Sequence, residues 1–145
     1  MVLRDGVVVA DKFVVVGVDG SEASLRAVDW AADEAGYRCA ILRIVHANLL
    51  TRDVLNSPVL EREAQRESAI ARVAFERARL RAPRVLVETR TVEPPAAESL
   101  IQESHGAELL VVGSRGLSRV QEILLGSVSR ECVVKAECSV LVVRS

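Results

Sequence analysis

Short apolar runs recur along the chain, and within each run apolar residues follow one another with few polar residues between them. Strands that are covered on both faces, as in a parallel sheet, have this pattern. The runs that we interpret as strands are Phe13–Val18, Ala40–Val45, Val85–Val92, Leu109–Val112 and Val140–Val143, with Val85–Val92 the most mixed. For residues 7–10 we predict either a small extra strand or an ordered arm.

Between these runs, apolar residues recur at intervals of three or four, which is the spacing of one buried helix face. The predicted helices run from the N-cap Ser21 to a stop at Gly36, over Pro58–Arg81, from Pro94 and Pro95 to about Ser104, and from Ser127 to Ala136. The residues expected to face inward are Leu25, Val28, Ala32, Ala35, Ala64, Ser68, Ala71, Phe75, Ala78, Ala97, Leu100, Ile101, Ser104, Val128, Cys132 and Ala136. The charged face of Pro58–Arg81 is expected to lie in solvent, and Ala47–Ser57 to form a loop.

Strands and helices therefore alternate along the sequence, and the first and last of these elements are strands. Such alternation predicts an α/β fold in which helices cover both faces of a mostly parallel five-stranded sheet, three layers in all. A chain of 145 residues has the length of one domain. We expect residues 1–145 to form a single domain, with residues 1–11 as an N-terminal arm.

Composition narrows the class of protein further. Half of the residues are apolar and 3% are aromatic, so the core is expected to consist of aliphatic side chains. A net charge of −1 argues against a nucleic-acid partner. Cys39, Cys132 and Cys138 lack metal-site spacing and are interpreted as buried thiols in a reducing compartment. With no apolar run of membrane-spanning length and no leader-like start, we expect a cytoplasmic protein without a membrane partner.

Small and polar residues gather where strands end, which is where open parallel sheets bind ligands. The first strand is followed by Asp19, and the fourth by a glycine loop that leads to Gly126 and Ser127 at the start of a helix. Glycine amides and a helix N-terminus suit a phosphate chain, with hydroxyls from Ser127 and Ser129. Asp19 can accept from a ribose or a base, beside an apolar slot formed by Val18 and residues 45–47.

Several other templates for catalysis and binding are absent. The chain has no Walker A loop, no G-x-G-x-x-G and no G-x-S-x-G elbow. His46 and His105 have no nearby ligand cluster, so we expect them to serve in packing or capping.

The spacing G-x2-G-x9-G-[ST], complete here as Gly113, Gly116, Gly126 and Ser127, resembles the ATP-binding branch of the universal stress protein family. The similarity extends from about Phe13 to Arg144 and includes VVVGVDGSEASLRAVDWAADEA, IVHA at 44–47 and the last third of the chain. It implies a flavodoxin-like or Rossmann-like fold, an ATP ligand accompanied by Mg²⁺, and a homodimer formed by pairing of the last strands around Val140–Val143. Ser139 departs from the proline that the family often has there, which leaves the geometry of the dimer open.

Carried over by position, the resemblance places the adenosine part near Asp19 and the phosphates near the glycine loop and the last helix. The implied site residues are Gly17, Val18, Asp19, Val45 or Ala47, Val112, Gly113, Ser114, Arg115, Gly116, Gly126, Ser127, Val128 and Ser129. Arg115 and Arg119 are counted with this site, with an ordinary surface position as the alternative. For Gly113 and Gly116 the alternative is a turn, and for Asp19 a helix cap.

The favoured hypothesis is a nucleotide-dependent switch in stress response, with ATP as the bound nucleotide and no catalytic residue. A slow ATPase is the first alternative, although neither ligand loop holds a histidine or glutamate apart from Glu122 in the spacer. A ligand-independent interaction module is the second alternative. The protein partner of such a switch does not follow from the sequence.

Overall fold

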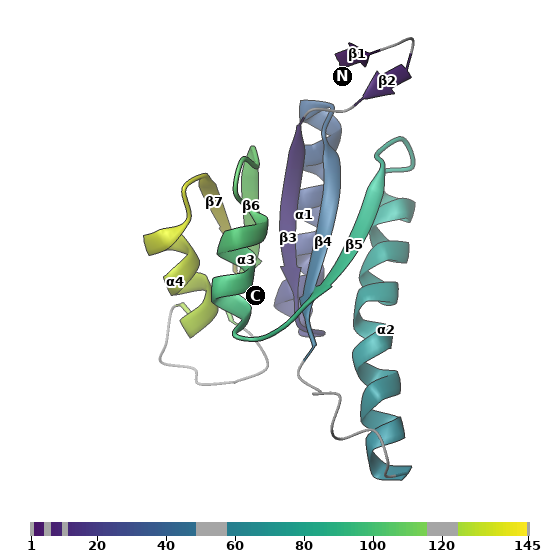
Figure 1. Cartoon of the computed structure of the whole chain (residues 1–145), viewed down its shortest axis with the longest axis vertical. Helices are drawn as coiled ribbons and strands as arrows, with labels where there is room; N and C mark the ends of the chain where they lie inside the picture. The colour runs from purple at the N-terminus through teal and green to yellow at the C-terminus, as the bar shows by residue number, and fades with distance from the viewer. Residues whose placement is uncertain (1, 5–6, 10–11, 49–57, 116–124, 145) are drawn as a thin grey trace.

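The computed structural model describes the backbone of residues 2–4, 7–9, 12–48, 58–115 and 125–144, and the side chains of residues 12–48, 61–115 and 125–144. Its strands and helices follow one another as the sequence predicts (Figure 1). In order they are β1 Val2–Arg4, β2 Val7–Val9, β3 Phe13–Val18, α1 Glu22–Arg38, β4 Ile41–Ala47, α2 Pro58–Arg81, β5 Val87–Val92, α3 Ala96–Glu103, β6 Leu109–Gly113, α4 Ser127–Lys135 and β7 Ser139–Val143.

A five-stranded sheet with every pair of strands parallel forms the middle layer, in the order β5-β4-β3-β6-β7. One face packs on α1 and α2 around residues such as Val14, Ile44 and Ala31. The other face packs on α3 and α4 around Leu110 and Cys132. These two cores confirm the three-layer α/β/α fold, and both consist mainly of aliphatic side chains.

At the N-terminus, β1 and β2 form an antiparallel pair in which Val2 is opposite Val9. The strand expected at residues 7–10 is therefore confirmed for Val7–Val9, whereas the sequence did not predict β1. In Figure 1 this pair lies above the amino ends of β3 and β4, away from the carboxyl ends of the sheet. Residues 49–57, within the predicted loop, lie outside the described residues.

Three predictions, one of a helix boundary and two of burial, are wrong. Helix α1 does not stop at Gly36: it continues to Arg38 and ends at Cys39, whose φ of 52° is the left-handed conformation of a C-cap. Cys39 is consequently exposed, against the prediction of a buried thiol. In α2, Ser68 is exposed and Ala74 is fully buried in its place, because the buried face follows Ala74 and Ala78.

The other cysteines differ in their surroundings. Cys132 is buried between α4 and the sheet as predicted, and Cys138 is half-buried. Burial raises the pKa of the Cys132 thiol to about 11, with the nearby Glu131 carboxylate acting in the same direction. The Cys132 thiol is therefore protonated at neutral pH, as expected of a structural cysteine.

Arginines on α2 join that helix to α1. The prediction that the charged face of α2 lies in solvent is therefore only partly right. The Arg77 guanidinium donates from Nε and Nη2 to the two Asp29 carboxylate oxygens at 2.8 and 2.7 Å. One turn further along both helices, Arg81 makes the same paired contact with Asp33 at 2.9 and 2.8 Å. The hydrogen bond from Arg77 lowers the pKa of Asp29 below its ordinary value.

Replacing Asp29 with asparagine should lower the free energy of unfolding at pH 7 by about 0.5–1 kcal/mol, because the pair is partly exposed. Since folding lowers the pKa of Asp29, this contribution is present above about pH 4 and is lost as the pH falls through the folded-state pKa. Urea unfolding of wild type and Asp29→Asn at pH 7 and pH 3 should show a difference at pH 7 that shrinks at pH 3. A constant difference would show that the charge contributes nothing.

Candidate functional site

The carboxyl ends of the parallel strands meet at one edge of the molecule, at the bottom of Figure 1. Strand β3 is the branch point: the chain next adds β4 and β5 on one side of it, and later β6 and β7 on the other. The strand order therefore reverses between β3 and β6. Open α/β sheets bind ligands beyond the strand ends at such a reversal. The structure thus brings the end of β3, the end of β6 and the start of α4 to one edge.

On the β3 side, Asp19 shapes the turn into α1. Its Oδ1 accepts a hydrogen bond from the Ser21 N–H at 2.9 Å, and the Ser21 hydroxyl oxygen accepts from the Ser24 N–H at 3.2 Å. Ser21 is therefore the N-cap, as predicted. Gly20 lies between them with a φ of 87°, a conformation that favours glycine. Asp19 is half-buried and supports this turn while it lies at the carboxyl edge.

On the β6 side, backbone hydrogen bonds fix the start of α4. The Ser114 carbonyl accepts from the Gly126 N–H at 2.6 Å and from the Ser129 hydroxyl at 3.2 Å. The Ser114 N–H in turn donates to the Val143 carbonyl of β7 at 2.7 Å. The buried Ser129 hydroxyl also lies 3.0 Å from the Gly126 carbonyl, so it has acceptors within the protein.

Helix α4 differs from α1 in how it begins. Its N-cap is Gly126, which has no side chain to cap the helix, whereas the Ser21 side chain caps α1. Ser127, the first helical residue, is exposed, and Val128 is half-buried. Amide N–H groups in the first turn of a helix, together with the positive end of the helix dipole, favour an anion.

The apolar residues of the predicted site differ in how much surface they expose. Val18, Val45 and Val112 are 5%, 1% and 3% exposed and pack within the two cores. Ala47, the last residue of β4, is half-buried at the edge. Of the two positions that the sequence left open, Ala47 is the one with surface to offer a ligand.

A Cβ would be crowded at two of the predicted positions, by backbone at Gly113 and by the end of a side chain at Gly17. A Cβ on Gly113 would lie 2.9 Å from the carbonyl carbon of Ala23 in α1, and one on Gly17 would lie 2.7 Å from Leu100 Cδ1. Gly113 therefore has a structural role, because the backbone of Ala23 has no freedom to move aside. Arg115 is half-buried at the end of the described segment. Gly116 and Arg119 lie outside the described residues.

Replacing Gly113 with alanine should lower the free energy of unfolding by about 1–3 kcal/mol, since the new methyl group meets backbone. The matched variant is Gly36→Ala, in the interior of α1, where a Cβ would make an ordinary 3.8 Å contact with Val85 Cγ2. That change should raise stability by about 0.5–1 kcal/mol. Thermal unfolding of both variants checks this, and a neutral effect of Gly113→Ala would contradict the proposed contact.

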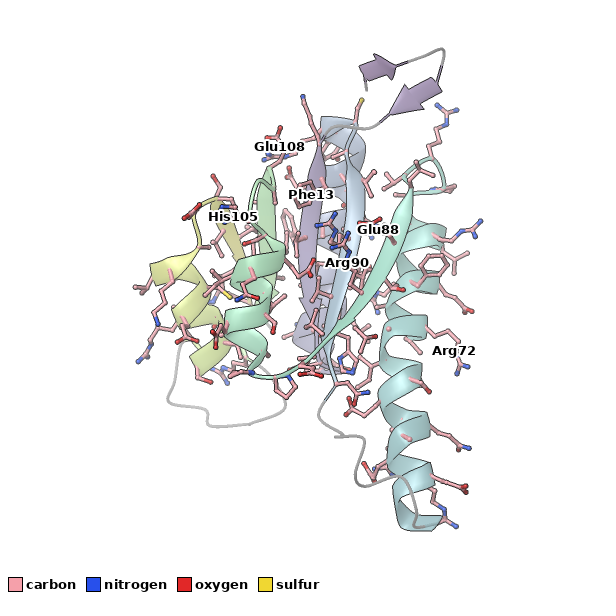
Figure 2. All side chains as sticks on the ribbon, viewed as in Figure 1. Phe13, Arg72, Glu88, Arg90, His105 and Glu108 are labelled. Atoms are coloured by element: carbon pink, nitrogen blue, oxygen red, sulfur yellow. The ribbon has the colours of Figure 1, made fainter. Side chains whose placement is uncertain are left out.

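Two side chains not assigned to the predicted site also lie near this edge. His46 is buried, as expected for a packing histidine, with Nδ1 3.1 Å from the Val18 carbonyl oxygen and Nε2 2.7 Å from Glu67 Oε2 on α2. The sequence gives no signal for Glu67, because 21 residues separate it from His46. His105 is remote from the edge: it is labelled in Figure 2 near the opposite end of β6, exposed, with Nδ1 3.4 Å from Glu137.

The described part of the chain contains no group of three or more histidine, cysteine or acidic side chains placed to hold a metal ion. Within the same residues, no helix combines the length and apolar character needed to cross a membrane. The site at the carboxyl edge is therefore defined by backbone amides, hydroxyls and the Asp19 carboxylate.

The fold is that of an α/β protein whose candidate site lies where the strand order reverses. A model of the universal stress protein family matches residues 12–144. The chain is 35% identical over 142 residues to universal stress protein Rv2624c of Mycobacterium tuberculosis, covering 92% of this chain and 48% of that protein. It is 33% identical over 135 residues to a universal stress protein of Thermus aquaticus, covering 92% and 98%. The chain belongs to the universal stress protein family, and it spans about half the length of the mycobacterial relative.

Solved structures agree with this assignment. A crystal structure of a universal stress protein in complex with cAMP matches with a TM-score of 0.71 at 35% identity, covering 94% of this chain and 98% of that one. A universal stress protein from Archaeoglobus fulgidus in complex with dAMP matches with a TM-score of 0.68 at 22% identity, covering 91% and 97%. The second likeness supports the fold alone.

Proposed function

We propose that this protein binds ATP with Mg²⁺ at the carboxyl edge and acts as a nucleotide-dependent switch in stress response. The observation that carries the proposal is the N-terminus of α4, which has a glycine as its N-cap and is held beside β6 at the reversal of strand order. The cAMP complex of a structural neighbour at 35% identity supports an adenine nucleotide as the ligand class.

The described residues fit such a ligand in two parts. Amides of the first turn of α4 and the exposed Ser127 hydroxyl would hold phosphate oxygens, as a helix N-terminus does. Asp19 would accept hydrogen bonds from the ribose, next to the half-buried Ala47 for the base. Bound Mg²⁺ would neutralise part of the triphosphate charge. With an aliphatic edge, the base would pack between side chains and backbone.

Binding accounts for this arrangement better than hydrolysis does. In the described part of the site, His46 is buried with both ring nitrogens within hydrogen-bond distance of protein oxygens, so it is not placed to activate water. Asp19 uses one carboxylate oxygen to support the turn into α1. A switch needs a ligand that binds and dissociates, and the α4 amides, Ser127 and Asp19 are groups that would bind one reversibly.

Replacing the exposed Ser127 with glutamate tests the proposal without weakening the fold. A carboxylate in the first turn of a helix stabilises it, so thermal stability should stay level or rise. The same carboxylate would repel phosphate from the α4 amides, and the affinity for ATP with Mg²⁺ measured by calorimetry should fall at least tenfold.

The matched control is Val134→Glu, which adds the same charge to an exposed position of α4 away from its N-terminus. This variant should bind ATP as the wild type does. Equal affinity of Ser127→Glu and wild type would contradict the phosphate site. Steady phosphate release that Ser127→Glu abolishes would favour the slow ATPase, and a wild type that binds no nucleotide would favour the interaction module.

We further propose that two copies pair through β7. Both β5 and β7 are edge strands of the described sheet, but they differ in chemistry. Strand β5 carries Glu88 and Arg90, and charged side chains protect an edge from pairing. The central residues of β7, Val140 to Val142, are aliphatic and half-buried, which leaves that edge unprotected.

Measuring the mass of the protein in solution tests the proposed dimer directly. Sedimentation equilibrium at tens of micromolar protein should give twice the monomer mass of 15.7 kDa. Introducing a lysine at Val142 should shift the equilibrium toward monomer, because edge lysines oppose pairing. A wild-type chain that sediments as a monomer at this concentration would contradict the proposal.

A further inference from the structure

A histidine and a glutamate meet behind the carboxyl edge, outside the set of groups that would touch a nucleotide. His46 is 4% exposed on β4, on the sheet face that α2 covers. Its Nε2 lies 2.7 Å from Glu67 Oε2, and the Glu67 side chain is 14% exposed. Its Nδ1 lies 3.1 Å from the Val18 carbonyl oxygen at the end of β3.

Hydrogen-bond chemistry limits where the protons of this pair can lie. A carbonyl oxygen only accepts, so Nδ1 of His46 carries a proton that it donates to Val18. Between Nε2 and Glu67 Oε2 there must be a second proton, either on the ring as an imidazolium or on the carboxyl group. With neither proton present, a ring lone pair would face a carboxylate at 2.7 Å, which is repulsive.

The pair reaches the proposed site through the backbone. Val18, whose carbonyl accepts from His46, directly precedes Asp19. One turn along α2 from Glu67, Ile70 lies against the same turn: a Cβ on Gly20 would be 3.2 Å from Ile70 Cγ1. Helix α2 therefore contacts the β3–α1 turn directly through Ile70, and indirectly through Glu67 and His46.

We infer that His46 and Glu67 are positioning residues for the adenosine side of the site, joining α2 to the end of β3 through one shared proton. The inference rests on the proposed function. Holding the Val18 carbonyl fixes the direction in which Asp19 leaves the sheet. Breaking the contact between His46 and Glu67 leaves Val18 and Asp19 less well ordered, so nucleotide affinity falls although neither His46 nor Glu67 touches the ligand.

The described elements packed against His46 carry the following ionisable groups. On β5, the residue level with His46 is the uncharged Thr91. Asp19 directly follows β3, and its Oδ1 accepts a hydrogen bond from the Ser21 N–H. Helix α1 also contacts β4, and the acidic residue of its first turn, Glu22, is exposed and lies 3.7 Å from Arg26. The charged group in hydrogen-bond contact with the ring, among the described residues, is Glu67 on α2.

Nitrogen NMR of the histidine rings tests the pair without any nucleotide. The chain has two histidines, and the exposed His105 serves as the internal reference. In the full-length wild type near neutral pH, His46 should carry a proton on Nδ1. In Glu67→Gln it should be a neutral ring with the proton on Nδ1, because the glutamine amide then donates to Nε2. A His46 ring with a bare Nδ1 in the wild type would overturn the inference.

Calorimetry with ATP and Mg²⁺ tests the link to the site. Glu67→Ala should weaken binding about fivefold or more, since a hydrogen bond to a charged group is lost. Glu67→Gln should restore most of that affinity because it keeps both hydrogen bonds of the ring. The control Glu76→Ala removes the same charge from an exposed position on α2 and should leave affinity unchanged.

Addition of nucleotide to the wild type should also shift the His46 ring signals and leave those of His105 in place. If the wild type binds ATP and Glu67→Ala binds it equally well, the inference is wrong while the proposed function stands. If the wild type binds no adenine nucleotide, the proposed function fails and the coupling fails with it, whereas the ring spectrum still reports the state of the pair.

Discussion

Close packing of β6 on the first turn of α1 determines the geometry of the carboxyl edge. At Gly113 the strand lies so near Ala23 that a Cβ would be 2.9 Å from its carbonyl carbon. The next residue, Ser114, joins this point to its neighbours, donating to Val143 of β7 and accepting from the N–H of Gly126. The starts of α1 and α4, on opposite faces of the sheet, are thereby fixed to the end of a single strand.

This backbone frame explains how a chain with a net charge of −1 would suit an anionic ligand. A broad basic surface attracts phosphates from a distance, but amides at a helix start act on an anion within the first turn and require no basic side chain. The two helix starts are also unlike each other. The Ser21 side chain caps α1, whereas the N-cap of α4 is a glycine with no side chain to accept from the first turn.

The fold followed from the sequence because continuous valine and leucine runs can be buried on both faces only in a covered sheet, and the helices between them then require parallel strands. That the described residues of the predicted site lie at one edge has a related reason, because the ends of parallel strands share an edge. The side-chain contacts that we did not predict depend on how helices and strands are placed against one another. The contact of Arg77 with Asp29 joins residues 48 apart, and that of His46 with Glu67 joins residues 21 apart. Gly36 misled because helix interiors tolerate glycine when another residue, here Cys39, forms the cap.

Helix α2 is attached to the rest of the fold at two levels, one of which lies next to the carboxyl edge of the sheet. Toward its C-terminus, Arg77 and Arg81 hold it to the aspartates of α1. Toward the carboxyl edge, Glu67 holds it to His46. Ala74, between these levels, and Ala78, beside Arg77, are both fully buried, so the helix approaches its neighbours through small side chains there. If a ligand displaced the end of β3, we expect these contacts to pass the displacement to α2, because packed elements shift as units and do not deform continuously.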